Sequence, residues 1–93
     1  MIPKPKRIAD PAATKAARRP YCEHCHKRTG GGPHHIITVG SGGPDHALNL
    51  LQLCGGCHTK AHSGQINKDK LWQIIGKREG IEDAEERVMQ MKV

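Results

Sequence analysis

The sequence predicts a small α+β domain that is held together by a structural zinc ion. Three observations predict it: two Cys-x-x-Cys pairs, two short apolar segments separated by a glycine-rich loop, and helical periodicity after the second cysteine pair. Ninety-three residues are enough for one domain. Aromatic residues make up only 2% of the chain and the whole apolar set 35%. A core of this kind stabilises a small domain by no more than about 3–5 kcal/mol, so a metal site is the expected supplement.

Residues 1–20 are expected to form a basic and mostly disordered arm. This segment contains four prolines, six lysines and arginines and a single acidic residue, and it shows no apolar periodicity. Residues 21–78 are also basic, whereas residues 79–93 hold five acidic residues against two basic ones, and the whole chain has a net charge of +6. Such a basic surface favours a polyanionic partner, of which nucleic acid is the usual one. The alternative is a tail that only improves solubility.

Residues 21–66 are expected to form the core of the domain. Residues 34–39 are rich in β-branched side chains and lie between a proline and a glycine, which predicts a short strand. Residues 40–47 are turn-forming throughout, and the apolar residues 48–53 predict a second strand that pairs back on the first. A helix is expected over residues 57–62, ended by a serine and a glycine.

Residues 67–93 are expected to form two helices that pack on this core. The first is expected from residue 67 or 68 to about residue 79, with leucine and isoleucine side chains on one face and a glycine after its last turn. The second is expected over residues 82–91, with Val88 and Met91 turned inward.

The two cysteine pairs predict a structural zinc site in an intracellular protein. Four thiolates complete the tetrahedral coordination of Zn²⁺ and leave no open position for a substrate. A thioredoxin-like redox pair and a disulfide framework are the alternatives, but the βαβ context of the first is missing. The charged N-terminus predicts no secretory signal, so we expect a cytoplasmic protein, in which disulfides are rare. No apolar stretch has the length of a membrane span, so no membrane partner is expected. The predicted zinc ligands are Cys22, Cys25, Cys54 and Cys57.

Four of the seven histidines predict a second metal site beside a reaction centre. His58 and His62 are four residues apart, so both point from one face of a helix and can share a metal ion. His34 and His35 are neighbours on a strand and face opposite sides, so that one can join the helix ligands while the other points toward a neighbouring centre. The alternative, polar surface histidines, is disfavoured because the four are concentrated on two elements that the fold brings together. The other histidines, His24, His26 and His46, are expected to lie outside this second site. His24 and His26 flank a predicted zinc thiolate and are expected to form hydrogen bonds or to face solvent, with His26 a minor candidate for an alternative zinc ligand.

Between Cys22 and His62 the sequence resembles the HNH endonucleases, also called His-Me finger or ββα-metal nucleases. The resemblance implies a ββα-metal core, and the subfamily with four zinc-binding cysteines often occurs in phages and prophages. The residues before Cys22 and after Gly64 lie outside it. The matching motifs are the first Cys-x-x-Cys pair, Pro33-His34-His35-Ile36, the glycine-rich loop Gly40-Ser41-Gly42-Gly43-Pro44-Asp45, Asn49-Leu50, Leu53-Cys54 and Cys57-His58-x-x-x-His62.

The resemblance implies a metal-dependent enzyme that hydrolyses DNA phosphodiester bonds and leaves 5′-phosphate and 3′-hydroxyl ends. It implies that His35 is the general base and that Asn49 orients this base. Many relatives have aspartate in place of His34, and an all-imidazole site accepts Mn²⁺, Ni²⁺, Co²⁺ or Zn²⁺ as well as Mg²⁺. The implied ligands of this catalytic divalent cation are His34, His58 and His62.

DNA is therefore the expected partner, and other phage proteins, such as those of packaging, are further candidates. A monomer and a homodimer are both compatible with the sequence, as are nicking and double-strand cleavage. The main alternative function is a non-catalytic zinc-stabilised module that binds nucleic acid, and a thiol redox protein is the third. The histidines and Asn49 favour the nuclease, because a module without chemistry does not need a base beside a metal site.

Overall fold

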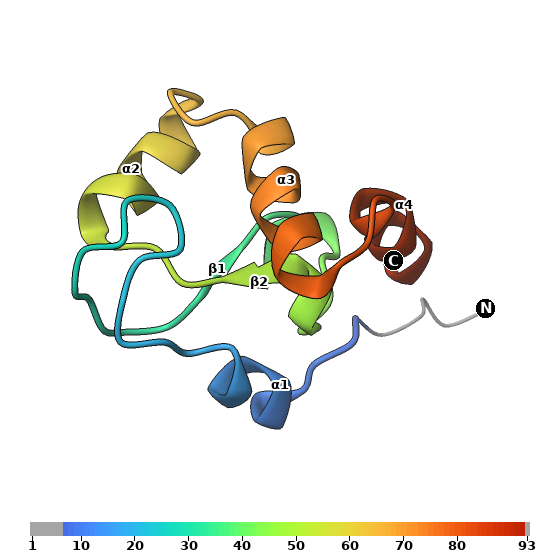
Figure 1. Cartoon of the computed structure of the whole chain (residues 1–93). Coiled ribbons are helices and arrows are strands. Elements are labelled where there is room, and N and C mark those ends of the chain that lie inside the picture. Colours follow the sequence, from blue (N-terminus) through green and yellow to red (C-terminus); the bar gives the residue numbers. More distant parts are fainter. Residues whose placement is uncertain (1–6, 93) are drawn as a thin grey trace, which may run out of the picture.

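The computed structural model describes residues 7–92, and a two-stranded sheet lies at its centre (Figure 1). Helix α1 lies below the sheet in this view, α2 at the upper left, and α3 and α4 on the right. A small α+β fold with C-terminal helices is thereby confirmed. The elements in chain order are α1 (Pro11–Ala16), β1 (His34–His35), the 3-10 turns η1 (Val39–Ser41) and η2 (Ala47–Asn49), β2 (Leu50–Leu51), α2 (Gly55–Ser63), α3 (Lys68–Glu79) and α4 (Ala84–Met91).

The two strands form the expected antiparallel hairpin but are much shorter than predicted. His34 pairs with Leu51 and His35 pairs with Leu50, so neither strand extends over the six residues that the sequence indicates. The strand pairing ends because the backbone of Ile37 bonds to the side chain of Asn49 instead of to a second strand. The Ile37 N–H donates to Asn49 Oδ1 at 2.8 Å, and Asn49 Nδ2 donates to the Ile37 carbonyl at 3.0 Å. The β-branched residues of the first segment therefore line the start of a loop.

The close return of this loop requires a glycine at position 43. A Cβ atom built on Gly43 would lie only 1.8 Å from the carbonyl oxygen of Ile37, a distance that no side chain tolerates. Gly43 is thus required by backbone packing, and Gly42 has a left-handed φ of 84°, whereas a Cβ atom on Gly40 would meet no atom within 4 Å.

The helices end where their local signals predict. Helix α2 ends at Ser63, and the residue that caps it, Gly64, adopts a left-handed conformation with φ of 84°. Helix α3 begins after Asn67, whose side chain accepts from the N–H of Lys70 at 2.9 Å. It ends at Glu79 and is capped by Gly80, which has a φ of 70°.

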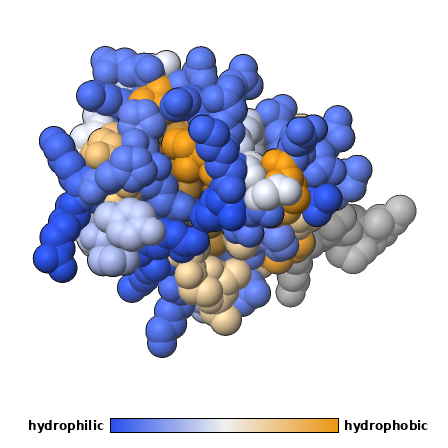
Figure 2. All heavy atoms as spheres, in the orientation of Figure 1, coloured by the Kyte–Doolittle hydropathy of each residue, from blue (hydrophilic) through white to orange (hydrophobic). Residues whose placement is uncertain are grey.

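The C-terminal helices complete the hydrophobic core, as predicted. Leu71 and Ile75 of α3 and Val88 of α4 are buried, and Met91 is partly buried against the same cluster. No helix within residues 7–92 is long and apolar enough to cross a membrane. The outer face drawn in Figure 2 is mostly hydrophilic, with hydrophobic residues in small separate patches.

Part of the expected basic arm is ordered, although residues 1–6 lie outside the described residues. Helix α1 forms because Asp10 caps it, accepting from the N–H groups of Ala12 and Ala13, and because proline occupies its first position. Ala17, which follows the helix, is buried. The difference from the prediction arises because a helix of six residues gives no apolar periodicity.

An arginine of α3 ties the first cysteine turn to the sheet. Arg78 Nη1 donates to the Glu23 carboxylate at 3.0 Å and to the carbonyl of Leu50 at 3.0 Å. Glu23, whose side chain is 7% exposed, also accepts from the N–H of Gln52 at 2.6 Å. These contacts hold α3, the first cysteine turn and β2 together.

Arg78→Met is expected to lower the free energy of unfolding by about 2–3 kcal/mol, because the buried Glu23 carboxylate loses charge-assisted hydrogen bonds. Chemical denaturation of the metal-loaded protein measures this loss. The matched control is Arg87→Met, since Arg87 pairs with Asp83 and both side chains are about half exposed, at 52% and 47%. The control should lose no more than about 0.5 kcal/mol. Equal losses in the two variants would contradict the assigned role of Arg78.

Candidate metal centres

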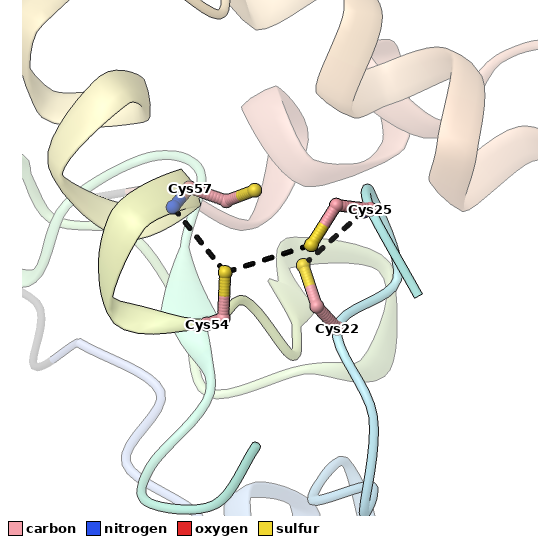
Figure 3. Close-up of side chains that lie close together, drawn as sticks. All are labelled: Cys22, Cys25, Cys54 and Cys57. Atoms are coloured by element: carbon pink, nitrogen blue, oxygen red, sulfur yellow. Dashed lines mark hydrogen bonds between the residues drawn. The ribbon is translucent and has the colours of Figure 1, made fainter. Parts of the chain in front are cut away.

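The four cysteines form one cluster whose sulfur atoms all lie within 4.8 Å of one another (Figure 3). Cys22 and Cys25 come from the turn before β1, whereas Cys54 and Cys57 come from the start of α2, and all four are free thiols. The Sγ atoms of Cys25 and Cys54 are 3.6 Å apart. The cluster can hold a metal ion, and the donor set of four thiolates suits tetrahedral zinc or iron.

Backbone N–H groups point at the sulfur atoms of this cluster. Cys22 Sγ accepts from the N–H groups of His24 and Cys25, both at 3.4 Å. Burial raises the pKa of Cys22, but the backbone hydrogen bonds outweigh burial and lower this pKa to about 6. Burial and the neighbouring thiols raise the pKa of Cys57 to about 12. A bound metal ion favours the thiolate form of each cysteine that binds it. A cation in this cluster would therefore offset the raised pKa of Cys57.

The turn around the first cysteine pair is tight. The N–H of His26 donates to the carbonyl of Cys22 at 2.9 Å, and the N–H of Cys22 donates to the carbonyl of Lys27 at 2.8 Å. His26 adopts a positive φ of 67°, and its side chain is exposed. His24, expected to form a hydrogen bond or to face solvent beside the cysteine cluster, lies with its Nδ1 atom 3.4 Å from Cys57 Sγ. An imidazole beside a ligating sulfur is a typical outer-shell partner of a metal site.

Three histidines form a second cluster, as the spacing predicts. The ring nitrogen atoms of His34, His58 and His62 lie within 4.8 Å of one another, and the two Nε2 atoms of the helical pair are 2.9 Å apart. His34 is buried on β1, and the other two project from α2 one turn apart. The spacing of these nitrogen atoms suits ligands of a single divalent ion, with further coordination positions left open.

The electrostatics of this cluster favour neutral imidazoles. Burial is the main cause that lowers the pKa of His34 to about 4, and positive charge on His58 and His62 lowers it further. Burial, with the same repulsion from His62, also lowers the pKa of His58. Because the metal-binding form of histidine is the neutral ring, these shifts keep the ligands ready near neutral pH.

Helix α2 connects the two clusters. Its cap residue Cys54 and its first-turn residue Cys57 belong to the cysteine cluster, and His58 is the next residue along the chain. A metal ion in the cysteine cluster would fix the start of α2 and thereby the direction of the histidine side chains.

His35 lies beside the histidine cluster but contacts a different group. Its Nε2 atom is 2.8 Å from Asp45 Oδ1, so the predicted alternation of His34 and His35 is seen in their contacts. A hollow of about 210 Å³ adjoins both histidines. It is lined by Pro33, His34, His35, Thr38, Val39, His58 and His62.

The carboxylate of Asp45 is bound from three directions. Besides His35, it accepts from Arg7 Nη1 at 2.7 Å and from the N–H of Asp10 at 3.0 Å. The hydrogen bond from Arg7 is the main cause that holds the pKa of Asp45 well below its usual range, against the opposing effect of burial. Sequence reasoning assigned no role to Asp45 or Arg7. The available signal was a single acidic residue in an otherwise glycine-rich loop.

Asn49 is fully buried and shapes the loop between the strands. Besides its two bonds to Ile37, its side chain donates to the carbonyl of Pro44 at 3.0 Å. Within residues 7–92 no hydrogen bond joins Asn49 to His35, so any influence of Asn49 on the imidazole passes through the loop backbone.

Comparison with known proteins gives one short similarity. No family model and no solved structure matches the chain. A segment of 36 residues is 42% identical to anaredoxin from Nostoc sp. (strain PCC 7120 / SAG 25.82 / UTEX 2576). This segment covers 39% of the present chain and 47% of anaredoxin, so the similarity spans about half the length of that protein. The chain is therefore similar to anaredoxin over part of its length.

Proposed function

We propose that this protein is a metal-dependent endonuclease of the HNH type, with a ββα-metal core, that hydrolyses phosphodiester bonds in DNA. The observation that carries the proposal is the placement of the three-histidine cluster and His35 around one hollow of about 210 Å³. A ligand set and a separate imidazole at one opening are what metal-assisted hydrolysis requires. The net charge of +6 supports a polyanionic substrate.

The four histidines divide into two parts in this reaction. His34, His58 and His62 would hold a divalent cation, which would supply Lewis-acid stabilisation of the charge that develops on phosphodiester oxygens. His35 accepts the proton of the attacking water at Nδ1, because its Nε2 already bonds to Asp45. The water oxygen bonds to phosphorus as the bond from phosphorus to the 3′-oxygen breaks. The 3′-oxygen takes up a proton from solvent, which leaves 5′-phosphate and 3′-hydroxyl ends.

The proposed partner is DNA, and the proposed location of the protein is the cytoplasm. The protein would bind DNA as a monomer or a homodimer, and other phage proteins are proposed as further partners. A non-catalytic module would share the basic charge and the cysteine cluster. It would have no use for neutral histidines around a hollow, so this cluster favours the enzyme over the module.

An end-labelled DNA duplex distinguishes cutting from binding. Purified protein is incubated with the duplex in Mg²⁺, Mn²⁺, Ni²⁺, Co²⁺, Zn²⁺ or EDTA, and the products are resolved on native and denaturing gels. The nuclease predicts shorter strands with 5′-phosphate ends in at least one metal and none in EDTA. Retarded but intact DNA in every metal would support the binding module instead.

A second candidate function is favoured by the partial similarity to anaredoxin. The name of that protein denotes a redox protein, and four thiolates that hold iron form a one-electron centre. Hydrogen bonds from backbone N–H groups to the sulfur atoms are compatible with either metal.

Metal analysis separates the two candidates, and we expect zinc in the cysteine cluster. Zinc has no redox chemistry and suits a structural site whose ligands tie a turn to a helix. Elemental analysis after mild chelation should find zinc, and the protein should be colourless. Stoichiometric iron with visible absorption that bleaches on reduction would favour the redox centre.

A further inference from the structure

We propose that Asp45 is a positioning residue that fixes the imidazole of His35, and that Arg7 from the N-terminal arm holds Asp45 in place. The part that His35 plays in hydrolysis rests on the proposed function. The contact between the two side chains does not, and it can be tested without any activity.

The geometry leaves the carboxylate little freedom. Oδ1 of Asp45 accepts from His35 Nε2 at 2.8 Å and from Arg7 Nη1 at 2.7 Å, while Oδ2 accepts from the N–H of Asp10 at 3.0 Å. The Asp45 side chain is 11% exposed and that of His35 21%, so solvent competes weakly for these bonds. Both oxygens are engaged, and rotation of the carboxylate would break at least one contact.

The arm is bound to the loop by its backbone as well. The N–H of Asp45 donates to the carbonyl of Ile8 at 2.8 Å, and Arg7 Nη1 donates to the carbonyl of Gly43 at 2.9 Å. Arg7 thus bridges the loop backbone and the loop carboxylate. Residues 7–10 therefore hold Gly43 and Asp45, the part of the loop that faces His35, in place.

The charge of Asp45 selects the state of the His35 ring. An ionised carboxylate only accepts hydrogen bonds, so the ring nitrogen that faces it must carry the proton. Nε2 of His35 is therefore protonated, and Nδ1 keeps its lone pair for a proton from water. The carboxylate also stabilises the imidazolium that forms when this proton is accepted, as in other His–Asp pairs. Asn49 shapes the loop, whereas Asp45 fixes the ring.

Asp45→Asn tests the proposal, because the amide has the same shape but no charge and offers an N–H where the carboxylate only accepts. If the protein cleaves DNA, kcat should fall by about 100-fold or more with little change in KM, since a wrongly protonated base loses most of its contribution. The matched control is Asp69→Asn on the exposed start of α3, which should cleave as the wild type does. An unchanged kcat in Asp45→Asn would overturn the positioning role.

A spectroscopic measurement makes the test independent of cleavage. Long-range ¹H–¹⁵N correlation spectra of the zinc-loaded protein report which ring nitrogen of His35 is protonated. We expect protonated Nε2 in the wild type and a mixture of tautomers, or protonated Nδ1, in Asp45→Asn. The same tautomer in both proteins would overturn the proposal even if the endonuclease were established. A wild type that does not cut DNA counts against the proposed function alone, and the spectra still decide the role of Asp45.

Arg7→Ala tests the contribution of the arm and covers the case in which Asp45→Asn folds poorly. This variant keeps the carboxylate but removes its closest charged partner, so kcat should fall by about 10-fold, the effect of one lost charge-assisted hydrogen bond. Arg18→Ala is the control, because Arg18 lies on the same arm with an exposed side chain. Equal activity of the two variants, with unchanged His35 spectra in both, would overturn the part assigned to Arg7.

Discussion

Replacement of His35 by alanine is expected to lower the rate of DNA cleavage by about 10²–10⁴-fold, the usual contribution of a general base. The variant should fold, keep its zinc and bind DNA, since His35 belongs to neither metal cluster and its side chain is half-buried at the edge of the hollow. Single-turnover cleavage of labelled DNA measures the effect on the chemical step.

His26→Asn is the control for loss of a histidine. His26 has an exposed side chain and a positive φ of 67°, which asparagine tolerates better than most residues. The control should cleave at the wild-type rate. Cleavage by His35→Ala at a near-normal rate would show that His35 is not the general base. The three-histidine cluster would then have no assigned base beside it.

Cys54→Ser is expected to unfold the domain at ambient temperature. Structural zinc contributes on the order of 10 kcal/mol to the folding of small zinc domains, more than a core with so few large side chains can replace. Cys54 also caps α2, where its sulfur accepts from the N–H of Cys57 at 3.5 Å. Circular dichroism and the dispersion of the amide NMR spectrum report the loss, and prolonged chelation of the wild type should reproduce it.

His58→Ala separates the two clusters. Like Cys54→Ser it removes a candidate ligand on α2, but His58 belongs to the three-histidine cluster. This variant should stay folded and lose metal-dependent cleavage. A well-folded Cys54→Ser protein, or an unfolded His58→Ala protein, would contradict the division into a structural and a catalytic centre.

Features with local causes were predictable from the sequence. The ends of α2 and α3 follow from Gly64, Asn67 and Gly80, which act within one turn of the helix. The convergence of His34 with the helical histidines follows from two periodicities, that of a strand and that of a helix. The cysteine cluster follows from the paired spacing of its thiols.

Features that depend on distant contacts were not predictable. The strands are short because the side chain of Asn49 replaces strand pairing at Ile37, an exchange that β-propensity does not reveal. The contact of Arg7 with Asp45 joins residues 38 positions apart, and the arm that carries Arg7 has no apolar pattern. The same holds for Arg78 and Glu23, which are 55 positions apart.

The most direct test of the central claim is the conversion of supercoiled plasmid by the wild type, followed over time in Mg²⁺, Mn²⁺, Ni²⁺, Co²⁺, Zn²⁺ and EDTA, with His58→Ala in parallel. Metal-dependent cutting by the wild type alone is the predicted result, and nicked circles that precede linear DNA would indicate one strand cut at a time. Intact plasmid in every metal, with folded zinc-loaded protein, would contradict the claim that this chain is an endonuclease.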